Sequence, residues 1–269
     1  SSISDYSSLI NFTTSAINYC NASGTNASEE YIGNVTLGVI NNNSSNSNGG
    51  YSDFTSLSTT LERGSTVSIS VTKLWGTPTQ YNEAIAVWID FNKNGLFDNS
   101  EKVVDDLSSQ ITPINANFVI PNTALLGNTR MRVMLKYFNA TNQSADNPCE
   151  NFNYGEVEDY TVAISGIWYR DLDNDTFGDS ANTVVAATQP VGYVSDNTDC
   201  VDTNNTIYPA APEILCNGID ENCNGMDDDE DVIAPICNAK DITVQLDSGT
   251  GLATIIGADI DNGSTDNYS

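Results

Sequence analysis

Hydrophobic and polar positions alternate in a way that indicates strands in the first part of the chain. Residues 66–72 (TVSISVT) and 129–137 (TRMRVMLKY) alternate with a period of two, residues 84–89 form a nearly continuous apolar run, and residues 117–121 end at a proline. Short segments of this kind between Asn-, Gly- and Ser-rich loops are typical of β-strands. We therefore predict that residues 1–165 form a β-sandwich of jelly-roll or Ig-like type.

The strand predicted over residues 129–137 has two unlike faces, because successive side chains of a strand point to opposite sides of the sheet. One face is apolar and the other is charged. The apolar face carries Met131, Val133, Leu135 and Tyr137, and the charged face carries Arg130, Arg132 and Lys136.

The hydrophobic pattern changes after residue 165. Residues 166–233 contain few alternating runs and many Asp-x-Asp and Asn-Gly pairs, so they offer little from which to build a core. Residues 234–269 return to a β-pattern, with strands predicted over 241–246 and 252–256, like the opening hairpin of a further β-sandwich. We expect an all-β chain in three parts: a sandwich, a core-poor loop module stabilised by disulfides and calcium, and the first strands of another sandwich from a longer protein.

Composition excludes several classes of function. The chain has 269 residues, 36 acidic and 9 basic side chains, a formal net charge of −27 and no histidine. Clustered Lys and Arg, which nucleic-acid binding needs, are absent. Without imidazole, Ser-His-Asp and Cys-His catalysis and His-containing zinc sites are excluded. No run reaches the roughly 18 apolar residues of a membrane helix, so we expect no membrane span in this segment.

The negative charge is concentrated. Residues 166–234 carry 15 acidic side chains and one basic side chain, a net charge of −14. Carboxylates packed into so short a segment repel one another unless a cation lies among them. The distribution of charge therefore predicts bound cations in this part of the chain.

Residues 90–101 match the calcium-loop pattern D-x-[DN]-x-[DN]-G-x5-E at every specified position. Oxygens at alternate positions, a Gly at the sharp turn, a main-chain carbonyl and a closing carboxylate complete the ligand set. The predicted ligands are Asp90, Asn92, Asn94, Leu96 through its carbonyl, Asp98 and Glu101. Strands are predicted on both sides, so this is a calcium loop on a β-scaffold; an Asn-Gly hairpin turn is the alternative.

Residues 220–231 repeat this pattern with a closing Asp in place of Glu, which weakens a bidentate ligand. The predicted ligands are Asp220, Asn222, Asn224, Met226 through its carbonyl, Asp228 and Asp231. A solvated acidic run is the alternative explanation.

Two further segments are candidates. Residues 171–179 place carboxylates at positions one, three, five and nine, although Thr176 stands where the pattern has Gly; without a cation, these carboxylates would have raised pKa values and repel one another. In residues 199–207, Asx-turn capping of a short helical turn explains the same side chains almost as well. The predicted ligands are Asp171, Asp173, Asp175, the Phe177 carbonyl and Asp179 in the first segment, and Asp199, Asp202, Asn204 and the Ile207 carbonyl in the second.

The ligand type indicates the metal. Carboxylate, amide and carbonyl oxygens in flexible loops suit Ca²⁺, whereas Mg²⁺ requires stricter octahedral geometry and copper or zinc prefers His or thiolate. We expect three to four calcium ions.

Six cysteines occur in a chain without a CxxC motif or a His, which favours disulfides over zinc and an extracellular or cell-surface location. Their pairing is open at this point. They are Cys20, Cys149, Cys200, Cys216, Cys223 and Cys237.

Four segments of the first 165 residues resemble the GEVED domain, a β-sandwich module of large secreted bacterial proteins. They are Tyr19-Cys20, residues 88–95, residues 127–133 and residues 154–162 (YGEVEDYTV). The resemblance implies that Cys20 pairs with Cys149 and that Glu156, Glu158 and Asp159 lie at a structurally important acidic turn. A solvated strand start is the alternative for these three residues.

Residues 168–231 resemble the MopE-type metal-binding motif, through WYRDLDND at 168–175, PVGYV at 190–194, Asp199-Cys200 and EILCNGIDENCNG at 213–225. The resemblance strengthens the Asp199 segment and adds Glu213 as a ligand. Ala187 stands where a cysteine is common, which leaves the pairing of Cys200, Cys216 and Cys223 open, and Val201 stands where an Asp is common. The family's name refers to copper, which we do not carry over because the chain has no His.

Residues 234–269 resemble the start of an HYR-like repeat, with Tyr268 where a cysteine is common, so Cys237 is expected to pair upstream or to be free. All three modules recur in giant surface proteins of gliding bacteria that are exported by the type IX secretion system. This resemblance implies a bacterial cell-surface or secreted protein.

We expect a non-enzymatic, calcium-stabilised structural or adhesion segment whose partners are calcium and either a surface polysaccharide or other copies or subunits of a surface assembly. An accessory region of a secreted hydrolase is one alternative. A carbohydrate-binding module that uses Trp75, Trp168 or Tyr81 is another, although such aromatic residues more often belong to a core or a strand pair.

Overall fold

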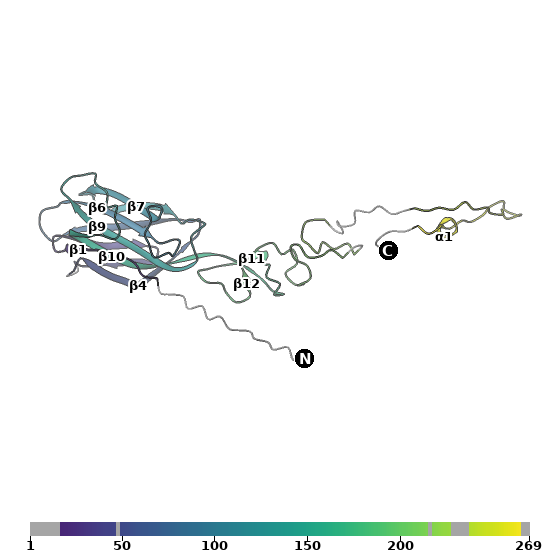
Figure 1. Ribbon diagram of the computed structural model, residues 1–269, viewed down its shortest axis with the longest axis horizontal. Coiled ribbons are helices and arrows are strands. Elements are labelled where there is room, and N and C mark those ends of the chain that lie inside the picture. Colours follow the sequence, from purple (N-terminus) through teal and green to yellow (C-terminus); the bar gives the residue numbers. More distant parts are fainter. Residues whose placement is uncertain (1–16, 47–48, 215–216, 227–236, 265–269) are drawn as a thin grey trace, which may run out of the picture. The chain divides into compact units, whose positions relative to one another are not determined.

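The computed structural model describes residues 17–46, 49–214, 217–226 and 237–264 (Figure 1). Strands dominate the described chain, as the sequence predicts, so the all-β class is confirmed. The strands are β1 (Ser23–Asn26), β2 (Glu30–Leu37), β3 (Ile40–Asn43), β4 (Tyr51–Glu62), β5 (Thr66–Trp75), β6 (Asn82–Ile89), β7 (Lys102–Ser109), β8 (Ile114–Val119), β9 (Gly127–Phe138), β10 (Asn151–Arg170), β11 (Asp179–Ala186) and β12 (Tyr193–Val194). Two short helices, η1 (Asn99–Glu101) and α1 (Gly257–Ile260), complete the elements.

Two sheets form the sandwich. One has the order β1-β10-β9-β6-β7, with β4, β11 and β12 also paired to β10, and the other has the order β3-β2-β5-β8. The second sheet is antiparallel throughout, whereas β1 and β4 each lie parallel to β10. The main hydrophobic core draws Ile32, Val35 and Val71 from one sheet and Val87 and Leu135 from the other.

The first sheet is also covered on its other face. A second apolar cluster includes Ala86 and Trp88 of β6 and Met134 of β9, and Tyr19 and Cys20 pack against it. This explains the unbroken apolar run of β6, because a strand buried on both faces needs no polar positions.

Arg132 lies on the charged face predicted for β9, and this part of the face is buried. The Arg132 side chain is only 2% exposed, and its guanidinium donates two hydrogen bonds of 2.8 Å to the carboxylate of Asp159 on the neighbouring β10. Arg130 binds the same carboxylate at 3.0 Å. The segment around Cys20 covers this face, and Cys20 is joined to Cys149 by a disulfide, the pairing that the GEVED resemblance implies.

Glu156, Glu158 and Asp159 do not lie at a turn, and they are not solvated. All three are fully buried within β10. Glu156 links the two sheets, since its Oε2 accepts a hydrogen bond of 3.2 Å from the backbone N–H of Ile32 in β2. Neither the acidic turn nor the solvated strand start is correct. The sequence shows that these residues are acidic, but it does not show whether buried hydrogen-bond donors lie next to them.

The chain divides into two compact units. The first comprises residues 1–166 with 185–188, and the second comprises residues 167–184 with 189–269. The β10 strand is continuous through the boundary at residue 166. Among the described residues of the second unit, the only buried hydrophobic side chains are Ile207 and Ala211.

The strands predicted over residues 241–246 and 252–256 are not formed. A turn does join these segments, with the Asp247 N–H bonded to the Leu252 carbonyl at 2.9 Å, but side chains such as Leu246, Leu252 and Ile256 are exposed. An isolated two-stranded hairpin is at best marginally stable, because it needs further strands to cover its apolar face.

Candidate metal centres

Three loops share one backbone conformation although their sequences differ. In the loops that begin at Asp90, Asp171 and Asp220, the fourth and sixth residues all have positive φ angles. These residues are Lys93 (55°), Gly95 (82°), Asn174 (66°), Thr176 (84°), Cys223 (57°) and Gly225 (89°). Thr176 is notable, since a β-branched residue with positive φ is strained. The common fold of the loops therefore does not depend on Gly at the sixth position.

The first Asp of each loop organises it in the same way. The backbone N–H of the sixth residue donates to the carboxylate of Asp90 at 3.0 Å, of Asp171 at 3.3 Å and of Asp220 at 2.7 Å. The chain thus wraps around its first carboxylate. Further short-range bonds from backbone N–H groups to the oxygens at positions three and five hold these side chains in the concave side of each loop, at 2.7–3.3 Å.

The loop at residues 90–101 joins β6 to β7 through η1. Asp90 is fully buried, and its Oδ2 also accepts a bond of 2.8 Å from the Tyr19 hydroxyl. Glu101 closes the loop: it is 3% exposed, and its two oxygens accept the N–H groups of Asn92 and Asp98, each at 3.1 Å. Burial raises the pKa of Glu101 above its ordinary value.

The other predicted ligands of this loop lie at its surface. Asn92, Asn94 and Asp98 are exposed, with the amides of both Asn side chains 3.4 Å from Asp98 Oδ2. The Leu96 side chain is 57% exposed. Because this side chain has no ligand atom, the predicted ligand is the main-chain carbonyl of Leu96.

A denser cluster forms where residues 171–175 meet the Asp199 segment. Carboxylate oxygens of Asp171, Asp173 and Asp175 lie within 4.8 Å of one another. Burial raises the pKa of Asp199, and the negative charges of Asp175, Asp173 and Asp202 raise it further, which places all five carboxylates in one neighbourhood. We call these five residues the Asp171 centre.

The two segments of the Asp171 centre are also joined by backbone contacts. The Leu172 N–H donates to Asp202 Oδ1 at 2.7 Å, and the Asp199 N–H donates to the Gly178 carbonyl at 3.3 Å. The sequence suggests two separate sites here, whereas the structure merges them.

Three oxygens of the Asp171 centre have no hydrogen-bond donor. They are the Oδ2 atoms of Asp173, Asp175 and Asp199, and each is buried. Asp171 and Asp199 are themselves 9% and 8% exposed. Leaving a buried carboxylate oxygen unsatisfied is costly, and a cation among these oxygens removes that cost. All the ligand atoms that this centre offers to a metal are oxygens, which fits a hard cation such as Ca²⁺.

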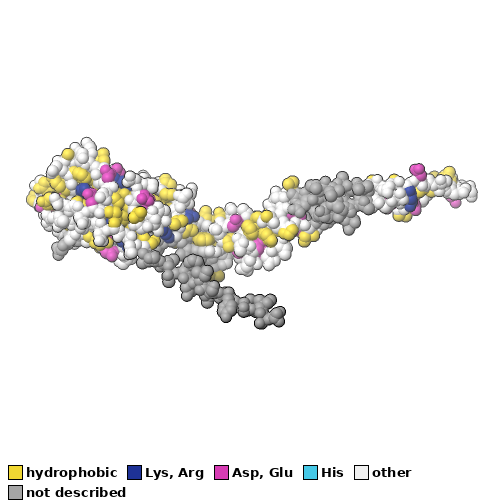
Figure 2. Space-filling view, viewed as in Figure 1, with side chains coloured by type: hydrophobic (Ala, Val, Ile, Leu, Met, Phe, Trp, Pro, Cys, Tyr) yellow, Lys and Arg dark blue, Asp and Glu magenta, His cyan; other side chains and the backbone are white. Residues whose placement is uncertain are grey.

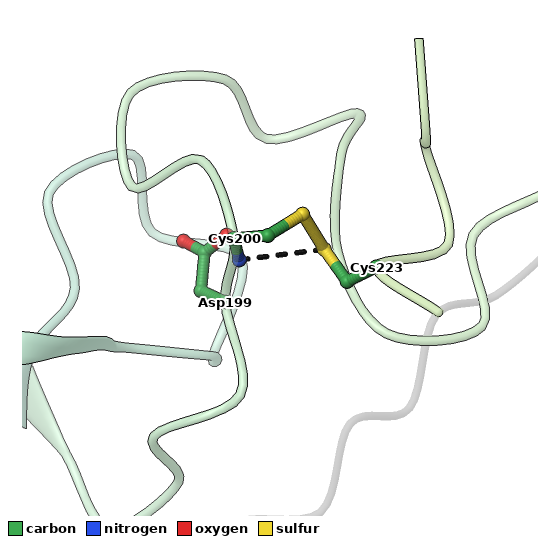
Figure 3. Close-up of side chains that lie close together, drawn as sticks. All are labelled: Asp199, Cys200 and Cys223. Atoms are coloured by element: carbon green, nitrogen blue, oxygen red, sulfur yellow. Dashed lines mark hydrogen bonds between the residues drawn. A yellow bond between two sulfur atoms is a disulfide. The ribbon is translucent and has the colours of Figure 1, made fainter. Parts of the chain in front are cut away.

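Cys200 and Cys223 lie beside Asp199 but offer no thiolate. Figure 3 shows their sulfurs joined in a disulfide, and the Cys200 N–H bonded to Cys223 Sγ at 3.3 Å. A disulfide sulfur is not the ligand that zinc or copper requires. Because Cys223 is the fourth residue of the Asp220 loop, the disulfide ties that loop covalently to the Asp171 centre.

The Asp220 loop acquires a closing carboxylate from outside the predicted pattern. The backbone N–H of Asn222, the third residue of the loop, donates to Glu213 Oε1 at 2.9 Å. The equivalent N–H of Asn92 donates to Glu101 at 3.1 Å. Glu213 therefore takes the place that Glu101 has in the first loop, and its Oε2 is buried without a hydrogen-bond donor.

Other predicted ligands are held in local turns, offer only a main-chain carbonyl, or lie outside the described residues. Asp179 Oδ1 accepts the Ala181 N–H at 2.8 Å, and Asn204 Oδ1 accepts both the N–H and the hydroxyl of Thr206, so the Asx-turn explanation holds for Asn204. The Ile207 side chain is buried. In the Asp220 loop, the Met226 side chain is exposed and only its carbonyl fits the predicted role, whereas Asp228 and Asp231 lie outside the described residues.

Sequence reasoning missed Glu221. This side chain is 3% exposed, and its Oε2 accepts the Ile214 N–H at 3.0 Å while Oε1 accepts from the Asn217 amide at 2.5 Å. It braces the entry to the Asp220 loop. Its position, second in the calcium-loop pattern, is unconstrained, so the sequence carries no signal for it.

Of the two alternatives expected for Cys237, the structure has the free one: its thiol is exposed and forms no disulfide with a described residue. Cys216 lies outside the described residues. Of the aromatic residues considered for sugar binding, Trp75 is half-buried and donates its indole N–H to buried Glu83 at 2.9 Å. That contact supports the interpretation of Trp75 as a strand-pair residue.

Comparisons with known proteins agree with two of the three resemblances. Residues 84–163 match the family model of the GEVED domain, and residues 199–229 match the MopE-type family model described as "Putative metal-binding motif". No curated protein and no solved structure matches the chain. Among the described residues, no helix has the length and apolar character needed to cross a membrane. The chain thus carries a GEVED domain followed by a MopE-type metal-binding motif.

Proposed function

We propose that this chain is a non-enzymatic, extracellular segment of a larger bacterial surface or secreted protein, in which calcium ions stabilise an Asp-rich unit next to a β-sandwich. The observation that carries the proposal is the Asp171 centre, with three buried carboxylate oxygens that lack donors. Calcium supplies positive charge to such oxygens and fixes the loops that carry them.

The packing of the second unit supports the same conclusion. Its described residues include two buried hydrophobic side chains, Ile207 and Ala211, and three buried carboxylates, Asp171, Asp199 and Glu221. Each buried aliphatic side chain contributes only about 1.5–3 kcal/mol. Small units with so little core are commonly held by disulfides or metals, and this unit has the Cys200–Cys223 disulfide as its covalent link.

The disulfides and the two family matches support the extracellular setting of this proposal. Disulfides persist in oxidising compartments, which favours an extracellular or cell-surface location. Adhesion to a surface polysaccharide, or assembly with other copies or subunits, is the role we assign to a stiffened segment of this kind. Export by the type IX system and service in gliding motility belong to the same proposal.

A pair of matched variants tests the metal role. Asp199→Asn removes a buried charge of the Asp171 centre, whereas Asp196→Asn alters a residue that makes the same kind of turn, with its Oδ1 accepting the Thr198 N–H at 2.9 Å. We expect Asp199→Asn to weaken calcium binding by about tenfold or more, because a charged ligand is lost. Asp196→Asn should leave the affinity within about twofold of the unaltered protein.

Isothermal titration of the metal-free protein with Ca²⁺, followed by thermal melting with and without calcium, provides the measurement. Calcium-dependent melting that Asp199→Asn abolishes supports the proposal. Equal heats of binding in both variants, or a melting curve that calcium does not change, would show that the carboxylates are only a solvated acidic surface.

A further inference from the structure

A pocket of about 200 Å³ on the sandwich shares no lining residue with the three candidate metal loops. It is lined by Glu29, Glu30, Tyr81, Tyr137 and Tyr154. Glu30 begins β2, Tyr81 precedes β6, Tyr137 is near the end of β9, and Tyr154 lies in β10. Elements of both sheets therefore contribute to it. Its volume lies below the range typical of drug-sized ligands and suits a single small group.

The three tyrosines form an aromatic box. The Tyr81 and Tyr137 rings have centroids 5.7 Å apart and an interplanar angle of 79°, and the Tyr137 and Tyr154 rings are 5.9 Å apart at 88°. Two rings thus stand nearly perpendicular to a third. The face of an aromatic ring carries partial negative charge, so walls of this kind attract cations.

The wall of the box also includes a buried carboxyl group. Glu30 is 2% exposed, and its Oε2 is buried without a hydrogen-bond donor. Glu83, fully buried, likewise has an Oε2 without a donor, and the charge of Glu30 contributes to raising the pKa of Glu83. Glu29 adds a third carboxylate, of which one oxygen accepts from the Asn26 amide at 3.2 Å.

The basic side chains nearest to these groups already have partners. Lys73, beside Glu83, pairs with Asp106 at 3.2 Å, and Lys136, adjacent to Tyr137, pairs with Glu150. Among the described residues, no Lys or Arg forms an ion pair with Glu29 or Glu30, although the charge of Lys73 acts on Glu83. A bound cation would balance the acid around the box, and the chain's net charge of −27 favours the approach of cations.

We propose that this box binds an organic ammonium group, with Tyr81, Tyr137 and Tyr154 facing the cation and Glu30 supplying the counter-charge. Calcium is a poorer occupant, because it requires six to eight oxygen ligands and the walls are largely aromatic. A neutral apolar group would leave the Glu30 carboxylate unsatisfied. Burial raises the pKa of Glu30 to about 7, with a further contribution from Glu29, so a cation would favour its charged form.

Titration of the calcium-loaded full chain with three small probes, followed by NMR of labelled tyrosine rings, tests the proposal. The probes are choline, its neutral isostere 3,3-dimethylbutan-1-ol, and Nα-acetyl-lysine methylamide. We expect at least one ammonium probe to shift the Tyr137 resonances and to bind about fivefold or more tightly than the neutral isostere. Stronger binding of choline indicates a quaternary headgroup, and stronger binding of the lysine derivative indicates a lysine side chain.

Two variants and one control locate the effect. Glu30→Gln keeps the shape of the side chain, and Tyr137→Leu opens the box; each should lower ammonium affinity about fivefold or more. Tyr31→Phe, at the next residue of β2 and on its other face, should leave the affinity unchanged. Equal affinity for the neutral isostere, full affinity in Glu30→Gln with an unchanged melting temperature, or displacement of choline by excess Ca²⁺ would each overturn the proposal.

Discussion

Carboxylates in this chain have different roles because their neighbours differ. Asp159 is buried and receives three hydrogen bonds from Arg130 and Arg132. Asp199 is buried beside other carboxylates and has an oxygen without a donor. The first arrangement is complete within the protein, whereas the second leaves an oxygen that a bound cation would satisfy in our proposal. Residue type alone does not distinguish them, and the outcome depends on whether a basic side chain faces the acid.

Glu158 of the sandwich belongs to neither arrangement. It is fully buried, and burial raises its pKa to about 8, although its Oε2 accepts a bond of 2.7 Å from the Tyr160 hydroxyl. A carboxyl whose pKa is raised on folding stabilises the folded state most below the unfolded pKa, near 4.5, and loses that contribution as pH rises through about 8. Glu30 and Glu83, with pKa values of about 7, act in the same direction.

We therefore predict that the free energy of unfolding of the calcium-saturated protein falls between about pH 5 and pH 8. The slope from any one group cannot exceed about 1.4 kcal/mol per pH unit. Glu158→Gln should flatten the profile because the neutral side chain no longer titrates. Urea unfolding at several pH values, monitored by tryptophan fluorescence, measures this effect.

The control for this experiment is Glu62→Gln, which alters an exposed glutamate of β4. Its pH profile should coincide with that of the unaltered protein. If Glu158→Gln retains the full slope, the buried carboxyl of Glu158 is not responsible for the pH dependence.

At the scale of elements, the spacing of Asp and Asn residues predicted where the three loops lie better than it predicted which carboxylates close them. Alternate Asp and Asn residues identified all three loops, because that spacing places side-chain oxygens on the same side of a tight turn. The closing groups come from elsewhere: Glu213 precedes the Asp220 loop, and Asp199 is far along the chain from Asp171. Only the MopE resemblance gave Glu213 a role, since separation in sequence does not report distance in space.

Strands were predictable where one or both faces are buried. The periodic segments correspond to β5, β6, β8 and β9, although β8 ends at Val119, before Pro121. The twelve-residue β4 gave no alternating signal, because it is largely polar and joins β10 by parallel pairing. Residues 241–246 carry the signal without forming a strand. An alternating pattern shows that a segment has an apolar face. A strand forms there only when another element covers that face.

The closing role of Glu213 gives a prediction for one element. Glu213→Gln removes the charge that completes the Asp220 loop, so calcium affinity at that loop should fall about tenfold. Titration calorimetry should show one weakened site and the others unchanged. Asp196→Asn, which removes one charge from the same unit, should weaken no site. If Glu213→Gln binds calcium with unaltered affinity, the ligand that closes the Asp220 loop is instead a residue within the predicted loop.

At the scale of the whole molecule, charge is divided unevenly between the two units. Of the nine basic side chains, seven lie in residues 1–165, and on the face seen in Figure 2 the few Lys and Arg side chains lie mainly on the sandwich. In the sandwich, Arg130 and Arg132 balance the buried Asp159, whereas the paired lysines bind more exposed acids. Residues 166–234 carry a net charge of −14, so their folded state depends on cations from solution in our account.

Hydrogen exchange measured by mass spectrometry, with saturating calcium and after chelation, tests this dependence most directly because it reports each segment separately. We predict that peptides covering residues 167–184 and 189–214 lose protection on chelation, whereas peptides from β5 and β9 keep theirs. Equal protection of the second unit with and without calcium would contradict the claim that calcium stabilises it.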